Sequence, residues 1–361
     1  MSSSSKLQQD IEISRKFNAA QDRLVLQASD MSLETVAAMV EKGAIDTQPT
    51  YQRRERWSAK RQSALIESFL LNIPIPPVYL AEEAYGKYTV IDGKQRLTTI
   101  ARFMRGKFSL TELEKFTELT GLRFSDLPTE PRNALEIRPY VRVITLLKQS
   151  DPDLKYEVFE RLNTGGEALF PQEIRNAAFR GSFNDLLFKL SDSSFLRKQL
   201  KITKNIEPAY LQMQDVEYVL RFFTMRNDWK GFSGDYRRSM DSFMEQNKDA
   251  TPNKLAQFKK SFNSAIERCQ EFWGDDAFKR FDGSGVRNQL LSGMYDAQMV
   301  GASLISESVY SNLIGKSVQI KRRTRKLFES GPFESWVRSG TNTRSSVLGR
   351  ISAIKDLLES V

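Results

Sequence analysis

Apolar residues recur at helical spacing in several stretches of the first 180 residues. Leu33, Val36 and Val40 lie three or four residues apart, which predicts a helix over residues 32–42 that ends at Gly43. The helix that follows Asp92 has an apolar face of the same kind. Similar patterns predict further helices over residues 59–71, 154–162 and 171–179.

Other stretches alternate between apolar and polar residues or are rich in β-formers, which predicts strands. Residues 78–80 and 88–91 fit a hairpin joined by a loop that contains Gly86, and residues 138–146 fit a further strand. The segment through Trp57 looks extended, and one or two strands are expected around Phe108 and Phe124. Mixed helices and strands predict an α/β or α+β first domain.

Beyond residue 180 the pattern is almost entirely helical. We expect three parts in the chain: a flexible arm over residues 1–28, an α/β domain over 29–180, and a mostly α-helical domain over 181–361. The helices are predicted at residues 183–200, 209–227, 235–248, 252–273, 285–309, 310–328 and 343–359.

The composition excludes several kinds of chemistry. The chain has no histidine, so it cannot contain an HNH nuclease site, an H-E-x-x-H zinc site or a Ser-His-Asp triad. Its one cysteine, Cys269, excludes an intrachain disulfide, and we expect this residue to be reduced within a helix. No run of about 18 apolar residues is present, so we expect a cytoplasmic protein.

The net charge of +9 is concentrated near the C-terminus. Residues 316–361 hold ten Lys and Arg and four Asp and Glu, which gives this segment a charge of +6. It is interpreted either as the solvated face of a surface helix or as a contact for DNA or RNA phosphates. The candidate DNA-binding residues are Lys321, Arg322, Arg323, Arg325 and Lys326.

The run Asp92-Gly93-Lys94-Gln95-Arg96 lies where a predicted strand gives way to a predicted helix. A glycine allows a tight turn there, and the free N–H groups and the dipole of the helix favour an anion. Taken alone, the run also fits an ordinary charged turn.

Three further segments accompany this run in a fixed order. Together the segments resemble the ParB/sulfiredoxin-like family formed by the GmrS-type N-terminal half of GmrSD restriction proteins, over residues 30–180. The family's members look like nucleotide-binding and nucleotide-hydrolysing modules of bacterial anti-phage defence, often fused to an HNH nuclease domain. The accompanying segments are residues 49–57 (PTYQRRERW), 65–80 (LIESFLLNIPIPPVYL) and 159–166 (FERLNTGG), the last closely followed by 172–176 (QEIRN).

The resemblance implies a nucleoside triphosphate site. Asp92 would hold Mg²⁺ or orient water, and Arg96 would bind phosphate, which makes these two the catalytic candidates. The turn Asn163-Thr164-Gly165 would line the same cleft, although by itself it fits a helix cap. The nucleotide-binding set implied is Tyr51, Gln52, Arg53, Gly93, Lys94, Gln95, Asn163, Thr164, Gly165, Glu173, Arg175 and Asn176.

One residue departs from the family pattern Asp-Gly-Gln-Gln-Arg, because Lys94 stands in the first Gln position. Lysine adds a mobile positive charge but cannot accept a hydrogen bond. Three functions therefore stay open. They are an NTP-hydrolysing defence or DNA-processing component, a nucleotide-gated DNA-binding sensor that acts with a separate nuclease, and, ranked last, a ParB-like Mg²⁺-dependent nuclease. An oligomer is compatible with each.

Overall fold

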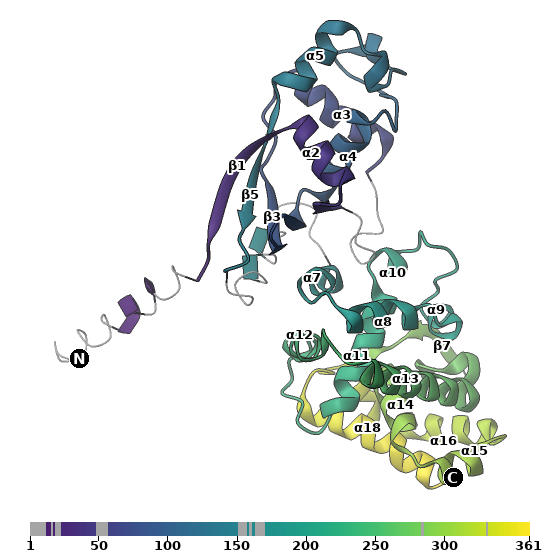
Figure 1. Cartoon of the computed structure of the whole chain (residues 1–361). Helices are drawn as coiled ribbons and strands as arrows, with labels where there is room; N and C mark the ends of the chain where they lie inside the picture. The colour runs from purple at the N-terminus through teal and green to yellow at the C-terminus, as the bar shows by residue number, and fades with distance from the viewer. Residues whose placement is uncertain are drawn as a thin grey trace, which may run out of the picture. The chain divides into compact units, whose positions relative to one another are not determined.

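The chain divides into two compact units, Met1–Leu169 and Phe170–Val361 (Figure 1). The computed structural model describes residues 12–15, 17–18, 23–47, 57–150, 157–158, 161–162, 170–282, 285–329 and 331–361. The second unit therefore begins about ten residues before the boundary predicted near residue 180. Each unit has a hydrophobic core of its own.

The first unit is built on a mixed five-stranded sheet with the strand order β1–β5–β3–β4–β2. β1 pairs antiparallel with β5 and β3 antiparallel with β4, whereas β5 and β3, like β4 and β2, are parallel. β3 and β4 form the predicted hairpin, and β1 begins inside the segment expected to be an arm. The strands are β1 (Leu26–Ser32), β2 (Ile45–Asp46), β3 (Val78–Ala84), β4 (Lys87–Asp92) and β5 (Tyr140–Leu146).

The core of this unit lies between the sheet and its helices (Figure 1). In β5, Val141 and Val143 are fully buried and Tyr140 and Arg142 are exposed, because successive side chains of a strand point to opposite faces. Apolar helix faces complete the core, as the periodicity predicts. These helices are α2 (Leu33–Glu41), α3 (Ala59–Leu70), α4 (Lys94–Met104) and α5 (Thr129–Ile137).

The prediction of strands around Phe108 and Phe124 is wrong. This stretch contains the short 3₁₀ turns η1 (Thr117–Leu119) and η2 (Phe124–Asp126). Phe108 and Phe124 pack on Phe103 of α4, with ring centroids 5.4 and 5.9 Å away. The backbone N–H groups of residues 114–116 donate to the carboxylate of Glu67 at 2.7–3.1 Å. A side chain therefore satisfies the backbone donors that a neighbouring strand would otherwise bind.

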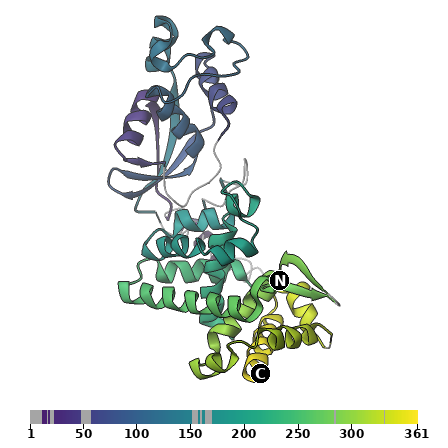
Figure 2. The ribbon, with the colours of Figure 1, turned by 90° about the vertical axis from the view of Figure 1, so that its right-hand side faces the viewer.

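The second unit is mostly helical, which with the first unit confirms the predicted fold class. Figure 2 shows its helices stacked against one another. They are α7 (Pro171–Ala178), α8 (Ser182–Ser191), α9 (Ser194–Gln199), α10 (Pro208–Leu211), α11 (Gln214–Asp228), α12 (Tyr236–Asn247), α13 (Pro252–Trp273), α14 (Ser292–Leu304), α15 (Glu307–Leu313), α16 (Ser317–Glu329), α17 (Phe333–Arg338) and α18 (Arg344–Glu359). Cys269 lies in α13, buried and unpaired, as expected.

A buried ionic network joins four helices around α14. Asp296 of α14 accepts hydrogen bonds from Arg221 of α11 at 2.6 and 2.7 Å, from Arg350 of α18 at 2.6 Å, and from the Tyr236 hydroxyl of α12 at 2.7 Å. The side chains of Asp296 and Arg350 are both fully buried. The two guanidinium groups keep the pKa of the Asp296 carboxyl low even though burial acts to raise it.

The predicted helix over residues 285–309 is wrong at its start. β7 (Gly285–Leu290) pairs antiparallel with β6 (Lys279–Asp282), and α14 begins only at Ser292. Val286 and Leu290 are four residues apart and both pack on the core, a spacing that suits a helix. Residues four apart also lie on the same face of a strand, so β7 achieves the same inward placement. The predicted helices 183–200, 209–227 and 310–328 are each two helices.

Candidate functional site

The turn between β4 and α4 is set by Gly93. Its φ of +95° is left-handed, and it occupies the N-cap position of α4. A Cβ at this position would lie 2.7 Å from Cγ2 of Val78 in β3, closer than any ordinary contact. Glycine is therefore required twice, once for the backbone conformation and once for the close approach of the two strands.

Asp92 and Arg96 face each other across this turn. Arg96 Nη2 donates to Asp92 Oδ2 at 2.7 Å, and Arg96 Nη1 donates to the Pro76 carbonyl oxygen at 2.6 Å. The Arg96 side chain is 11% exposed and the Asp92 side chain 39%. Arg96 thus fixes the orientation of the carboxylate, while Asp92 remains open to solvent. The Pro74–Pro77 segment supplies an anchor that the sequence did not predict.

Gln95 connects the same turn to the start of α3. Its side-chain oxygen accepts from the Trp57 backbone N–H at 3.4 Å, and the Trp57 carbonyl accepts from Gln62 at 2.7 Å. Gln62 in turn accepts from Arg102 of α4 at 3.0 Å. Two helices are therefore tied together by polar contacts beside Asp92. The Thr98 hydroxyl, one helical turn after Lys94, is buried without a hydrogen-bond partner in the described part of the chain.

Six of the predicted nucleotide-binding residues lie outside the described residues: Tyr51, Gln52, Arg53, Asn163, Thr164 and Gly165. The described positions that flank residues 48–56 are Thr47, directly after β2, and Trp57. β2 runs parallel to β4, with Asp46 opposite Thr89, so both strands point toward the edge that carries Asp92. Trp57 is bound to Gln95 at that edge.

Glu173, Arg175 and Asn176 lie in α7 of the second unit, and each is almost completely buried. Arg175 Nε donates to Asp241 at 2.7 Å, and Asn176 Nδ2 donates to the Met213 sulfur at 3.0 Å. Glu173 accepts from the Phe170 backbone N–H at 2.8 Å and so caps α7. The structure therefore gives these three predicted binding residues partners within their own unit.

The predicted basic segment forms α16. Lys321 pairs with Asp276 at 2.9 Å, and Arg323 donates to the Ser360 carbonyl at 2.7 Å, so these two cations hold the unit together. Arg322 and Lys326 are exposed, and Arg325 is partly buried. In total, residues 170–361 contain 30 Lys and Arg and 22 Asp and Glu, which places +8 of the net +9 in the second unit.

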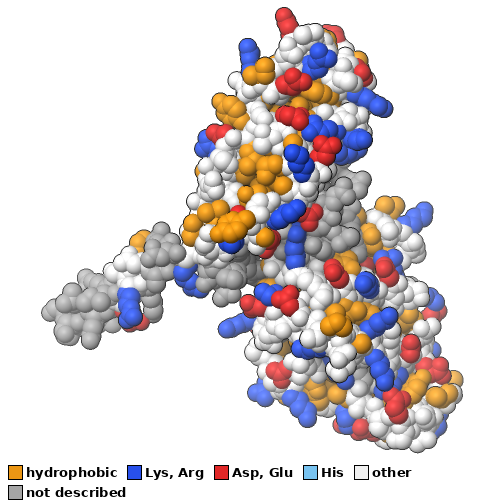
Figure 3. Space-filling model, viewed as in Figure 1, with side chains coloured by type: hydrophobic (Ala, Val, Ile, Leu, Met, Phe, Trp, Pro, Cys, Tyr) orange, Lys and Arg blue, Asp and Glu red, His pale blue; other side chains and the backbone are white. Residues whose placement is uncertain are grey.

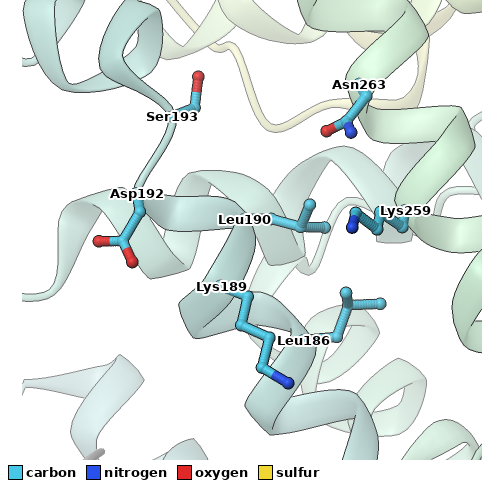
Figure 4. Close-up of a pocket in the computed structure, with 7 residues that line it drawn as sticks. All are labelled: Leu186, Lys189, Leu190, Asp192, Ser193, Lys259 and Asn263. Carbon is cyan, nitrogen blue, oxygen red and sulfur yellow. The ribbon is translucent and has the colours of Figure 1, made fainter.

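Basic side chains are not confined to α16. Figure 3 shows Lys and Arg distributed over the visible face of the second unit among acidic side chains. A surface pocket of about 340 Å³ lies between α8 and α13, and in Figure 4 Lys259 and Asn263 extend from α13 toward Leu190. The sequence did not single out this pocket, because its residues come from α8 with the two residues that follow it and from α13, 60–80 positions further along the chain. It is lined by Leu186, Lys189, Leu190, Asp192, Ser193, Lys259 and Asn263.

The described residues contain no cluster of three or more Cys, Asp or Glu that could hold a metal by itself. Within the same residues, no helix is both long and apolar enough to cross a membrane.

Comparison with known proteins supports the resemblance. Residues 36–180 match the model of a family described as the GmrSD restriction endonuclease, N-terminal domain. The match confirms the family similarity that the ordered motifs indicate, and it spans the Asp92–Arg96 turn. No curated protein and no solved structure matches the chain.

Proposed function

We propose that the first unit binds a nucleoside triphosphate at the Asp92–Arg96 turn and hydrolyses it, as a component of a restriction or anti-phage defence system. The observation that carries the proposal is the turn itself. A partly exposed carboxylate is oriented by a largely buried arginine side chain at the N-terminus of α4, in a segment that matches the N-terminal domain of a restriction protein family. The restriction context comes from that match.

The chemistry of the turn suits a phosphate chain. The N–H groups in the first turn of α4 and the Lys94 ammonium supply positive charge. Residues 48–56 contain Arg53, Arg54 and Arg56, and the described positions on both sides of them lie toward the Asp92 edge.

Mg²⁺ fits this site as a partner of the nucleotide. Asp92 has one oxygen bound to Arg96 and a side chain that is 39% exposed, so its second oxygen can face a cation. Mg²⁺ is commonly held by one or two carboxylates together with substrate phosphates and water. A lone carboxylate at the turn is thus a sufficient protein ligand. The ion would neutralise phosphate charge during transfer.

Lys94 decides between turnover and binding alone. If the first Gln of the family pattern orients water, Lys94 cannot replace it, and the chain would act as a nucleotide-gated sensor. Phosphate release by the wild type would establish hydrolysis. Release that appears only in Lys94→Gln would favour the sensor, and no release from either variant would contradict hydrolysis by this turn.

We further propose that the second unit contacts DNA and that a separate nuclease acts with it. The net charge of +8 on this unit supports a polyanionic partner. Direct Mg²⁺-dependent nuclease activity ranks lower, because the described residues hold no carboxylate cluster. Nicking of a plasmid by the purified protein would reverse this ranking.

The binding test is thermal unfolding with Mg²⁺ and each of ATP, GTP, CTP and UTP. A ligand bound only by the folded state raises the midpoint, by about 2.7 kcal/mol of stability at a hundred times its dissociation constant. Asp92→Asn should abolish the shift. Asp30→Asn is the matched control. Like Asp92, Asp30 of β1 is partly exposed, at 37%, and is bound by an arginine, Arg142 of β5, at 2.9 Å. An equal shift in wild type and Asp92→Asn would refute the site.

A further inference from the structure

The second unit carries a two-stranded antiparallel ribbon formed by β6 and β7. β6 and β7 pair only with each other, and in Figure 2 they project to one side of the helices. Phe281 and Val286 are cross-strand partners on the inner face, where Phe281 packs against Phe328 of α16. The ribbon is therefore anchored along one face, and its other face is available for contact.

The outer face of the ribbon carries two arginines, Arg280 and Arg287. Arg280 lies directly opposite Arg287, an arrangement in which like charges oppose pairing. The positive charge of Arg280 is balanced by an ion pair with Glu334 of α17. Arg287 is exposed.

The register shift next to this pair points two polar side chains outward. Asn288 and Gln289 are consecutive and both exposed, whereas an unbroken strand would turn one of them inward. Among the described residues, neither side chain has a hydrogen-bond partner. The ribbon thus displays exposed Arg, Asn and Gln side chains in succession.

Lysines from several segments gather at the base of the ribbon, around the 3₁₀ turn η3 (Gly274–Asp276). Lys198 binds Asp275 at 2.6 Å and Lys321 binds Asp276 at 2.9 Å. Lys279 in β6 and Lys201 after α9 belong to the same group. Burial lowers the pKa of Lys279, and the charges of Lys201 and Lys198 lower it further, against the opposing effect of Asp276 and Asp275. Four lysines thus surround two carboxylates.

We propose that this ribbon enters the major groove of double-stranded DNA, with Arg287, Asn288 and Gln289 at base edges and Lys198 and Lys201 on phosphates. The major groove accommodates a two-stranded β-ribbon, Arg pairs with guanine there, and Asn or Gln pairs with adenine. The proposal rests on the proposed DNA partner of the second unit. It adds a contact surface that is distinct from the exposed residues of α16.

The experiment measures binding of the full chain to a labelled mixed-sequence duplex by fluorescence anisotropy over a range of salt concentrations. Arg287→Ala should weaken binding about 10-fold, and Asn288→Ala with Gln289→Ala by a similar factor. Lys198→Gln with Lys201→Gln should reduce the slope of log affinity against log salt by about 2. Thermal unfolding of each variant checks that the second unit stays folded.

Lys260→Ala is the matched control, because it removes one exposed positive charge from the same unit. Lys260 lies 13 residues before the end of α13 at Trp273, about 20 Å along the helix from the η3 turn. The affinity of the Lys260→Ala variant for the duplex should stay within about 2-fold of that of the wild type. A loss in Lys260→Ala equal to that in Arg287→Ala would mean nonspecific attraction and would overturn the ribbon assignment.

Dimethyl sulfate footprinting identifies the groove. Protection of guanine N7 by the wild type, lost in Arg287→Ala, is expected, since N7 lies in the major groove. Protection of adenine N3 alone would place the contact in the minor groove and overturn the proposal. Equal competition by single-stranded DNA or polyglutamate would also overturn it.

If the wild type does not bind duplex at low salt, the proposed DNA partner fails together with the ribbon. If it binds but the ribbon variants match it, the ribbon inference alone fails.

Discussion

The conformation of the Asp92–Arg96 turn can be tested by adding a single methyl group to Gly93. In Gly93→Ala the new Cβ meets two penalties. A φ of +95° is unfavourable for an L-residue by about 1–2 kcal/mol. The Cβ would also lie 2.7 Å from Val78 Cγ2 in a core strand, and overpacking of this kind costs about 1–3 kcal/mol.

A second glycine separates the two penalties. Gly86, in the turn between β3 and β4, has a φ of +72°, but a Cβ added there would have no neighbouring atom within 4 Å. Gly86→Ala should therefore cost only the conformational term, about 1–2 kcal/mol, whereas Gly93→Ala should cost about 2–5 kcal/mol. For a unit of this size, a loss of about 3 kcal/mol lowers the melting temperature by roughly 9 °C.

The assay is urea unfolding of the two variants and of Gly93→Ala in a Val78→Ala background. Removing the Val78 methyl groups relieves the approaches of 2.7 and 3.1 Å and leaves only the Cβ of residue 78, at 3.2 Å, so the cost of Gly93→Ala should fall there toward the conformational term of about 1–2 kcal/mol. Equal costs at Gly86 and Gly93, or an unchanged cost in the Val78→Ala background, would refute the close packing of the turn against β3.

Three further predictions concern stability, pH and charge. Asp296→Asn leaves two buried guanidiniums without their shared anion and should cost about 3–5 kcal/mol in urea unfolding, partly recovered by adding Arg350→Met. Glu67 is 6% exposed, and burial alone would raise its pKa, but three hydrogen bonds from backbone N–H groups hold the pKa below the ordinary value of 4.5. The stability that the ionised carboxylate contributes is therefore complete above pH 4.5 and is lost as the pH falls further. The stability difference between wild type and Glu67→Gln should thus narrow between pH 7 and pH 3. Arg322 and Lys326 are exposed on α16, and neutralising both should reduce the slope of log DNA affinity against log salt concentration by about 2. An unchanged slope would exclude α16 as a DNA contact.

Local signals predicted most of the helices because those signals lie within the helices themselves. α2 begins after Ser32, whose hydroxyl accepts from the Thr35 N–H, and α13 begins at Pro252 after the capping residue Thr251. The β3–β4 hairpin and the strand-to-helix turn at Gly93 were predicted for the same reason. Each depends on residues close together in the chain.

Features that depend on distant partners were not predictable. The carboxylate of Glu67 accepts the backbone hydrogen bonds of residues 114–116, which lie more than 45 positions away. The hydrogen bond of Arg175 to Asp241, 66 residues further on, could not be predicted from the local pattern. The β6–β7 ribbon was missed because Val286 and Leu290 suit a helix equally well until their pairing with β6 is known.

The most direct test of the nucleotide site is hydrogen exchange measured by mass spectrometry, with and without Mg²⁺ and each nucleoside triphosphate. A ligand at the Asp92–Arg96 turn should slow exchange in peptides that cover the first turn of α4, while peptides from β1 stay unchanged. Protection confined to the second unit, or no protection with any of the four nucleotides, would contradict the account.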